Sequence, residues 1–134
     1  MHLDAALITA LNVILIFVAM GVVGRARGIH KIKAPAIIGN PDFERAFRAH
    51  QNTLEQTVMF LPVLWLASIY GNEQYAAWLG YAWLLARLWY LYGYVKAADS
   101  RGGGFTAAFL AWAGLLILSL IGVVPKLLAS SALG

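Results

Sequence analysis

Residues 5–24 read AALITALNVILIFVAMGVVG and contain no charged side chain. Residues 105–124 (FTAAFLAWAGLLILSLIGVV) form a second such stretch near the other end of the chain. Each is close to the roughly 20 apolar residues that a helix needs to cross about 30 Å of hydrocarbon. The first stretch exceeds the apolar region of a signal peptide, roughly 7 to 15 residues, and no Lys or Arg precedes it. We therefore expect both stretches to be transmembrane helices of the mature protein.

The composition of the whole chain agrees with a membrane protein. Of its 134 residues, 61% are hydrophobic and 12% are charged, whereas soluble domains contain about 25% charged residues. The chain contains no cysteine, which excludes disulfides, thiolate nucleophiles and cysteine metal ligands. No metal is predicted, and any thiol chemistry requires a thiol that a substrate supplies.

The basic side chains gather in two connections between the apolar segments. They are Arg25, Arg27, Lys31, Lys33, Lys96 and Arg101. Basic clusters beside apolar spans follow the positive-inside rule better than they fit a nucleic-acid surface, so no nucleic-acid partner is expected. The rule predicts that both connections lie in the cytoplasm and that both termini lie outside it.

Two further helices are expected between the outer spans. Asn40 is a suitable N-cap and Pro41 a suitable first residue for the second helix. Asn72 is a suitable capping residue for the third, which the glycines at 102–104 are expected to end. Pro125 is expected to end the fourth. The prediction is one all-α domain over residues 1–134, an integral membrane four-helix bundle with helices at about 5–24, 41–70, 74–101 and 105–124.

Each of the two middle helices carries a polar stripe. The stripes consist of Arg45, Arg48, Asn52 and Glu55 in the second helix, and of Arg87, Tyr90, Tyr94 and Arg101 in the third. Spacings of three, four and seven residues place each set on one helix face. A charged side chain at the bilayer centre costs roughly 2.5 to 3.5 kcal/mol on insertion scales, so the stripes should face the bundle interior or a wet cavity.

Two interpretations of the stripes stay open from the residues alone. The charged groups could pair with each other between helices, and Arg45 could extend to the headgroups, which we favour for that residue. The complete set, however, offers more hydrogen bonds than helix pairing needs. Arginines bind carboxylates, Glu55 can bind an ammonium group, and Asn52 can bind peptide groups. This combination suits a small peptide with two carboxylates and one amine.

The residues around the stripes resemble a known family. Residues 43–55 (FERAFRAHQNTLE), and residues 86–94 (ARLWYLYGY) through Arg101, are similar to helices 2 and 3 of the MAPEG superfamily, membrane-associated proteins in eicosanoid and glutathione metabolism. The similarity is greatest to the branch that contains microsomal glutathione transferase 2 and leukotriene C4 synthase. The four-helix layout extends the resemblance over nearly the whole chain.

The resemblance implies a homotrimeric glutathione transferase with glutathione as co-substrate and a lipophilic electrophile arriving from the membrane lipid. The implied glutathione contacts are Arg48, Asn52, Glu55, Tyr90 and Tyr94, with Arg27 and His50 from an adjacent subunit. Arg101 matches the catalytic arginine that the family places against the thiol. A free thiol has a pKa of about 8.5, and a nearby guanidinium favours its thiolate. Arg45 and Arg87 receive supporting roles, and the site is expected to open toward the cytoplasm.

Three positions depart from the leukotriene synthase pattern. Gln56 stands in place of a tyrosine, His50 in place of a glutamine, and Gly28 in place of a second arginine. These departures favour a broad glutathione transferase, with activity on lipid hydroperoxides, over leukotriene-specific synthesis. The alternatives are a non-catalytic lipid-binding scaffold of the same fold and a small transporter or channel subunit. The latter is disfavoured because the outer helices offer little polarity beyond Asn12 and Ser119.

Overall fold

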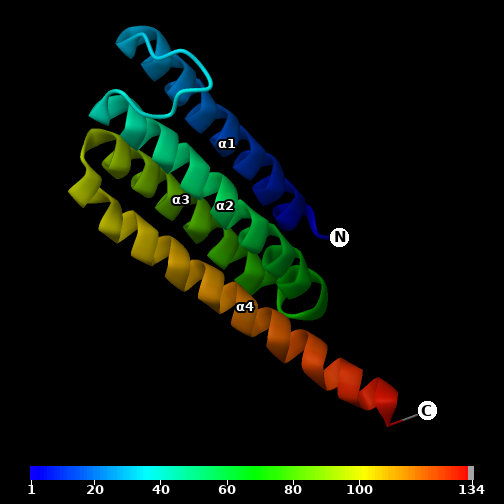
Figure 1. Cartoon of the computed structure of the whole chain (residues 1–134). Helices are drawn as coiled ribbons and strands as arrows, with labels where there is room; N and C mark the ends of the chain where they lie inside the picture. Colours follow the sequence, from blue (N-terminus) through cyan, green and yellow to red (C-terminus); the bar gives the residue numbers. More distant parts are fainter. Residues whose placement is uncertain (133–134) are drawn as a thin grey trace.

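The computed structural model describes residues 1–132, which form four long helices and one short 3-10 helix (Figure 1). They are α1 (Leu3–His30), α2 (Pro41–Tyr70), α3 (Glu73–Lys96), η1 (Ala98–Arg101) and α4 (Gly102–Ser131). Consecutive helices run antiparallel, so the loop over residues 31–40 and η1 lie at one end of the bundle. The N-terminus and the α2–α3 turn lie at the other end. Helices α1 and α4 each pack against both α2 and α3.

The chain forms a membrane helical bundle. In the part of the chain that the structure describes, three helical segments are long and apolar enough to cross a membrane, namely Leu3–His30, Pro41–Tyr70 and Ala98–Ser131. The outer surface is apolar along these segments, since Phe17 and Ile121 are both about two-thirds exposed. Water would be an unfavourable neighbour for such side chains, whereas lipid tails are not. Inside the bundle, the rings of Phe60 and Trp83 stack at 3.7 Å between centroids.

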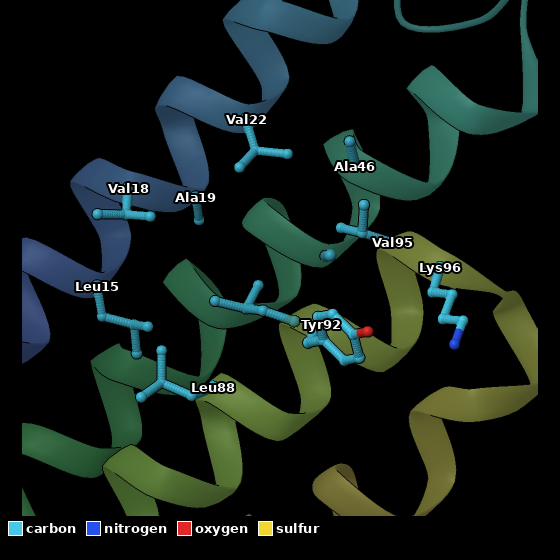
Figure 2. Close-up of a pocket in the computed structure, with 11 residues that line it drawn as sticks. Leu15, Val18, Ala19, Val22, Ala46, Leu88, Tyr92, Val95 and Lys96 are labelled. Carbon is cyan, nitrogen blue, oxygen red and sulfur yellow. The ribbon is translucent and has the colours of Figure 1, made fainter.

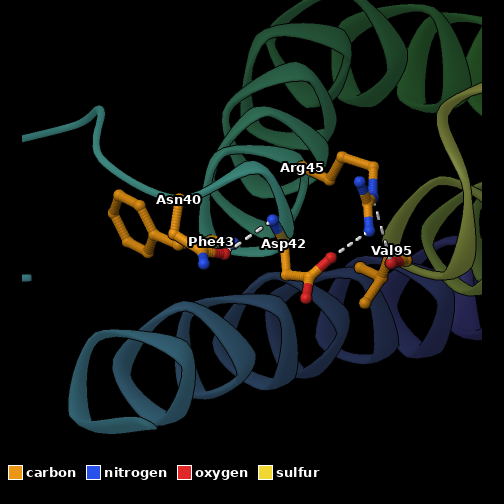
Figure 3. A network of polar contacts seen from close by, with 5 residues as sticks. All are labelled: Asn40, Asp42, Phe43, Arg45 and Val95. Carbon is orange, nitrogen blue, oxygen red and sulfur yellow. Dashed lines mark hydrogen bonds and ion pairs between the residues drawn. The ribbon is translucent and has the colours of Figure 1, made fainter. Parts of the chain in front are cut away.

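Helix α2 begins at Pro41 because Asn40 caps it, as Figure 3 shows. The Asn40 side-chain oxygen accepts hydrogen bonds from the backbone N–H of Asp42 (2.9 Å) and of Phe43 (3.3 Å), two donors without a partner inside the helix. Arg45 follows one turn later, pairs with Asp42, and donates from Nε to the Val95 carbonyl at 3.5 Å. Arg45 therefore joins the start of α2 to the end of α3.

Helix α1 continues beyond the expected end at Gly24 to His30, which corrects the predicted loop over residues 25–40. No proline interrupts residues 25–30, and the basic Arg27 and His30 in the last turn interact favourably with the helix dipole. The helix ends where Lys31 adopts a left-handed conformation with φ of 54°. The connection to α2 is therefore shorter than the sequence suggested.

The glycines at 102–104 do not separate the last two helices as expected; they begin α4. Helix α3 ends at Lys96 rather than near residue 101, because Ala97 is extended and η1 follows. A Cβ atom on Gly104 would lie 2.4 Å from the Tyr90 nitrogen. Helix α4 thus packs closely against α3 at Gly104. A glycine stands here because it has no side chain, and not because it breaks a helix.

Pro125 does not end the fourth helix, which continues to Ser131. A proline removes one backbone donor, and membrane helices tolerate this loss where neighbouring groups compensate. The predicted end near residue 124 is corrected accordingly. The change lies far from the polar stripes and does not affect them.

Candidate functional site

A polar pocket of about 330 Å³ lies between α2, α3 and the start of α4. It is lined by Asn52, Tyr90, Arg101, Gly102, Phe105 and Thr106. Four of these side chains carry N–H or O–H donors, and the Phe105 ring supplies an apolar wall. Within residues 1–132, no group of three His, Asp or Glu side chains is placed to hold a metal ion. The pocket therefore suits an organic ligand with several hydrogen-bond acceptors.

Arg101 brings a positive charge to this pocket. It is exposed at the end of η1, and its Nη1 lies 3.4 Å from the Tyr94 hydroxyl, to which it donates. The guanidinium carbon lies 5.3 Å from the centre of the Tyr94 ring. In the described part of the chain, no carboxylate pairs with Arg101. Its charge is consequently available to an anionic group of a ligand.

Two stacked tyrosines on α3 form the wall behind Arg101. The rings of Tyr90 and Tyr94 lie 5.6 Å apart at an angle of 12°, and both side chains are buried. A spacing of four residues places them on one face of α3. The ring of Phe105 on α4 lies 6.3 Å from that of Tyr90. These contacts restrain the Tyr90 side chain, which lines the pocket.

Arg87 lies directly behind the pocket and is only 1% exposed. Its Nη2 donates to Asn52 Oδ1 at 3.0 Å and to Thr53 Oγ1 at 2.6 Å. Its guanidinium carbon lies 3.9 Å from the centre of the Tyr90 ring. Charged groups that pair between helices were one interpretation of the stripes, but within residues 1–132 Arg87 forms no ion pair with Glu55. Arg87 contacts two pocket residues instead.

The remaining predicted contacts lie outside this pocket. Arg48 and Glu55 are exposed, His50 is half-buried, and none of their side chains forms a hydrogen bond or ion pair within residues 1–132. Arg27 donates to the carbonyls of Ala36 (2.7 Å) and Ile32 (3.4 Å), so it fastens the α1–α2 loop. One chain therefore brings together Asn52, Tyr90, Tyr94 and Arg101, with Arg87 behind them.

Sequence reasoning did not single out three residues of this region. Thr53 anchors Arg87, while Phe105 and Thr106 line the pocket. Thr53 and Thr57 lie four residues apart on α2 and form a buried polar row. This spacing in the sequence could have indicated that the two threonines share one helix face. The positions of Phe105 and Thr106 depend on how α4 packs, and their residue types carried no signal.

A larger cavity, of about 520 Å³, lies between α1, α2 and α3 (Figure 2). Its lining is almost entirely aliphatic, with polar atoms from Tyr92 and Lys96. A second apolar cavity of about 360 Å³ shares Leu15, Val18 and Leu88 with it. A zwitterionic peptide would leave its polar groups without partners there. These cavities suit hydrocarbon chains, whereas the pocket at Asn52, Tyr90 and Arg101 is the candidate site for a polar ligand.

Comparison with known proteins agrees with this architecture. The chain matches the model of the MAPEG family over residues 5–121. It is 45% identical over 122 residues to an uncharacterised protein of Synechocystis sp., a match that covers 91% of this chain and 89% of the relative. It is 43% identical over 106 residues to microsomal glutathione S-transferase 2 of Mus musculus, covering 79% of this chain and 72% of the relative. Leukotriene C4 synthase of Cavia porcellus is 37% identical over 108 residues, covering 81% and 72%. The matched region includes both polar stripes and all the pocket residues, and the chain belongs to the MAPEG family.

Proposed function

We propose that this protein is a membrane-bound transferase that activates the thiol of glutathione for attack on a lipophilic electrophile. The observation that carries the proposal is the pocket in which Asn52 and Tyr90 meet the guanidinium of Arg101, which pairs with no carboxylate within residues 1–132. The relatives named glutathione S-transferase and leukotriene C4 synthase support this class of reaction. Glutathione carries two carboxylates, an amine and peptide groups, which suit a pocket rich in donors.

In the proposed reaction, Arg101 stabilises the thiolate of bound glutathione by its charge. The Tyr94 hydroxyl, 3.4 Å from Nη1, restrains the guanidinium. With 1-chloro-2,4-dinitrobenzene, the thiolate sulfur bonds to the ring carbon that carries chlorine. Chloride then leaves with the electron pair of the broken bond, and the thiol proton passes to water. With a lipid hydroperoxide, two glutathione molecules would be oxidised to the disulfide while the hydroperoxide is reduced to an alcohol and water.

We further propose that the working enzyme is a homotrimer whose neighbouring subunit supplies Arg27 and His50. What supports this is the position of Arg48 and Glu55 on α2, where both side chains are exposed and unpaired within the described residues. Hydrocarbon is an unfavourable neighbour for such groups. A second copy covering this face, with glutathione between the copies, would satisfy them.

We also propose that the site faces the cytoplasm, with both termini outside. The loop over residues 31–40 and η1 lie at the same end of the bundle (Figure 1). This end carries the basic side chains of both connections, as the positive-inside rule requires of a cytoplasmic surface. Soluble glutathione would then enter from the cytoplasm, and the electrophile from the bilayer.

The test is conjugation of glutathione to 1-chloro-2,4-dinitrobenzene by the purified protein in detergent. We expect turnover by the wild type and a fall of about 100-fold or more in kcat for Arg101→Ser, because the positive charge that stabilises the thiolate is lost. Lys33→Ser, which removes a basic side chain from the loop at the same end, is the matched control and should retain activity. Absence of wild-type turnover with several electrophiles would refute the transferase and favour a lipid-binding scaffold.

A further inference from the structure

Within residues 1–132, Arg87 is a buried positive charge without a negative partner. It is 1% exposed, and among the same residues its buried Nε finds no hydrogen-bond partner. The ion pairs within residues 1–132 are His2–Glu73 and Arg45–Asp42, so no carboxylate compensates it. Burying an uncompensated charge destabilises a fold, and well-packed apolar residues are often more stable in such places. Helix packing alone therefore gives a poor reason for an arginine at this position.

The hydrogen bond from Arg87 determines how the Asn52 amide is oriented. A guanidinium has only donors, so Asn52 must turn its oxygen toward Arg87, at 3.0 Å. The oxygen and the NH₂ group diverge from the amide carbon, so the NH₂ group points away from Arg87. Asn52 also lines the pocket. We propose that Arg87 is a positioning residue that fixes Asn52 with its NH₂ group toward the pocket, where it donates to an acceptor of bound glutathione.

The same guanidinium restrains a second wall of the pocket. It lies over the Tyr90 ring, 3.9 Å from its centre, and Tyr90 in turn stacks on Tyr94. Without Arg87, the Asn52 amide could rotate and present its oxygen to the pocket. An oxygen there would repel the carboxylate or carbonyl oxygens of the ligand instead of binding them. This inference rests on the proposed function, since glutathione is the ligand that Asn52 would hold.

Thr53, the second residue that accepts a hydrogen bond from Arg87, allows an experiment to distinguish a positioning role of Arg87 from a packing role. Thr53 Oγ1 accepts at 2.6 Å and is buried, and Thr53 does not line the pocket. Thr53→Val removes this contact and leaves the bond between Arg87 and Asn52. If Arg87 only held helices together, loss of either contact would have similar consequences. If Arg87 positions Asn52, only changes at Arg87 or Asn52 should affect glutathione binding.

The experiment compares Arg87→Met and Thr53→Val with the wild type in detergent, by kcat, by KM for glutathione and by Tm. We expect Arg87→Met to raise KM about tenfold or more, with kcat at saturating glutathione within about threefold. Its Tm should stay equal or rise, because a methionine removes the unpaired charge. Thr53→Val should lower Tm and change KM by less than about twofold. Should Arg87→Met fail to fold, Arg87→Lys, which keeps the charge with fewer donors, should also raise KM.

A double variant tests whether Arg87 acts through Asn52. Asn52→Leu should raise KM, and adding Arg87→Met should raise it little further, because the group that Arg87 positions is already absent. Equal changes in KM for Arg87→Met and Thr53→Val would overturn the inference. Increases in KM from Arg87→Met and Asn52→Leu that multiply in the double variant would also overturn it. The proposed function would still stand in either case, provided that the wild type turns over glutathione. A wild type that neither binds glutathione in calorimetry nor conjugates it would refute the proposed function itself.

Discussion

The close packing of α4 against α3 at Gly104 gives a direct test of the pocket geometry. A Cβ atom added at Gly104 would lie 2.4 Å from the Tyr90 nitrogen, 2.6 Å from its Cα and 3.0 Å from the Ala86 carbonyl oxygen. Favourable contact needs roughly 3.5 Å. All three atoms belong to the backbone, which cannot turn aside as a side chain can. In Gly104→Ala, the start of α4 must therefore move about 1 Å away from α3.

This displacement should reach the site, because Phe105 and Thr106 line the pocket from α4. Overpacking of this kind costs roughly 1 to 3 kcal/mol, which lowers Tm by several degrees. A shift of about 1 Å in a catalytic group can cost on the order of 100-fold in rate. We expect kcat/KM for glutathione conjugation to fall about 10- to 100-fold in Gly104→Ala, measured together with Tm by differential scanning fluorimetry.

Gly24→Ala is the matched control, since it makes the same change in a helix where a Cβ would meet nothing within 4 Å. An alanine in place of a helical glycine should leave activity intact and stabilise the fold slightly. Gly104→Ala with wild-type Tm and kcat/KM would refute the reasoning, because α4 would then tolerate the methyl group without moving. Loss of activity in Gly24→Ala to the same extent would show that the effect is not specific to the pocket.

Three further predictions concern the bundle and its orientation. Asn40→Ala should lower the free energy of unfolding by about 1 kcal/mol, because two N–H groups at the start of α2 lose their acceptor. Asn40→Asp should retain the cap, and chemical denaturation in detergent compares the two variants. Asn12→Leu should leave Tm unchanged or raise it, since the buried side-chain oxygen of Asn12 has no hydrogen-bond partner among residues 1–132, and a clear fall in Tm would contradict this. The native chain has no cysteine, so a membrane-impermeant maleimide should label Ser130→Cys in intact cells and Lys33→Cys only after permeabilisation. The reverse labelling pattern would invert the proposed orientation.

Several elements could be predicted from local sequence because their causes are local. The uncharged stretches at 5–24 and 105–124 lie within α1 and α4, since length and polarity alone decide whether a helix can cross hydrocarbon. Asn40 followed by Pro41 marks the start of α2 for the same reason. The spacing of Tyr90 and Tyr94 places both on one face, as the helical repeat requires.

Other expectations failed where one residue type serves two purposes. The glycines at 102–104 read equally well as a helix break and as a packing surface, and only the nearness of the Tyr90 backbone to Gly104 decides between them. The basic residues after Gly24 resembled a loop, yet they extend α1 because a helix C-terminus favours positive charge. Pro125 stays within α4, although a proline commonly ends a helix in water.

The sequence by itself determined the membrane class, the capped start of α2 and the polar faces of α2 and, as far as Tyr94, of α3, because hydrophobic length and helical period are properties of one segment. Arg101, expected on the same face of the third helix, lies in η1 beyond the end of α3. Only the tertiary structure decided which members of those faces meet. It brought Asn52, Tyr90 and Arg101 to one pocket, left Arg48 and Glu55 exposed, and buried Arg87 against Asn52 and Thr53. Such contacts depend on the packing of α4 and α3 against α2. The distance between two helices depends on the side chains of both, so the sequence of one segment does not determine it.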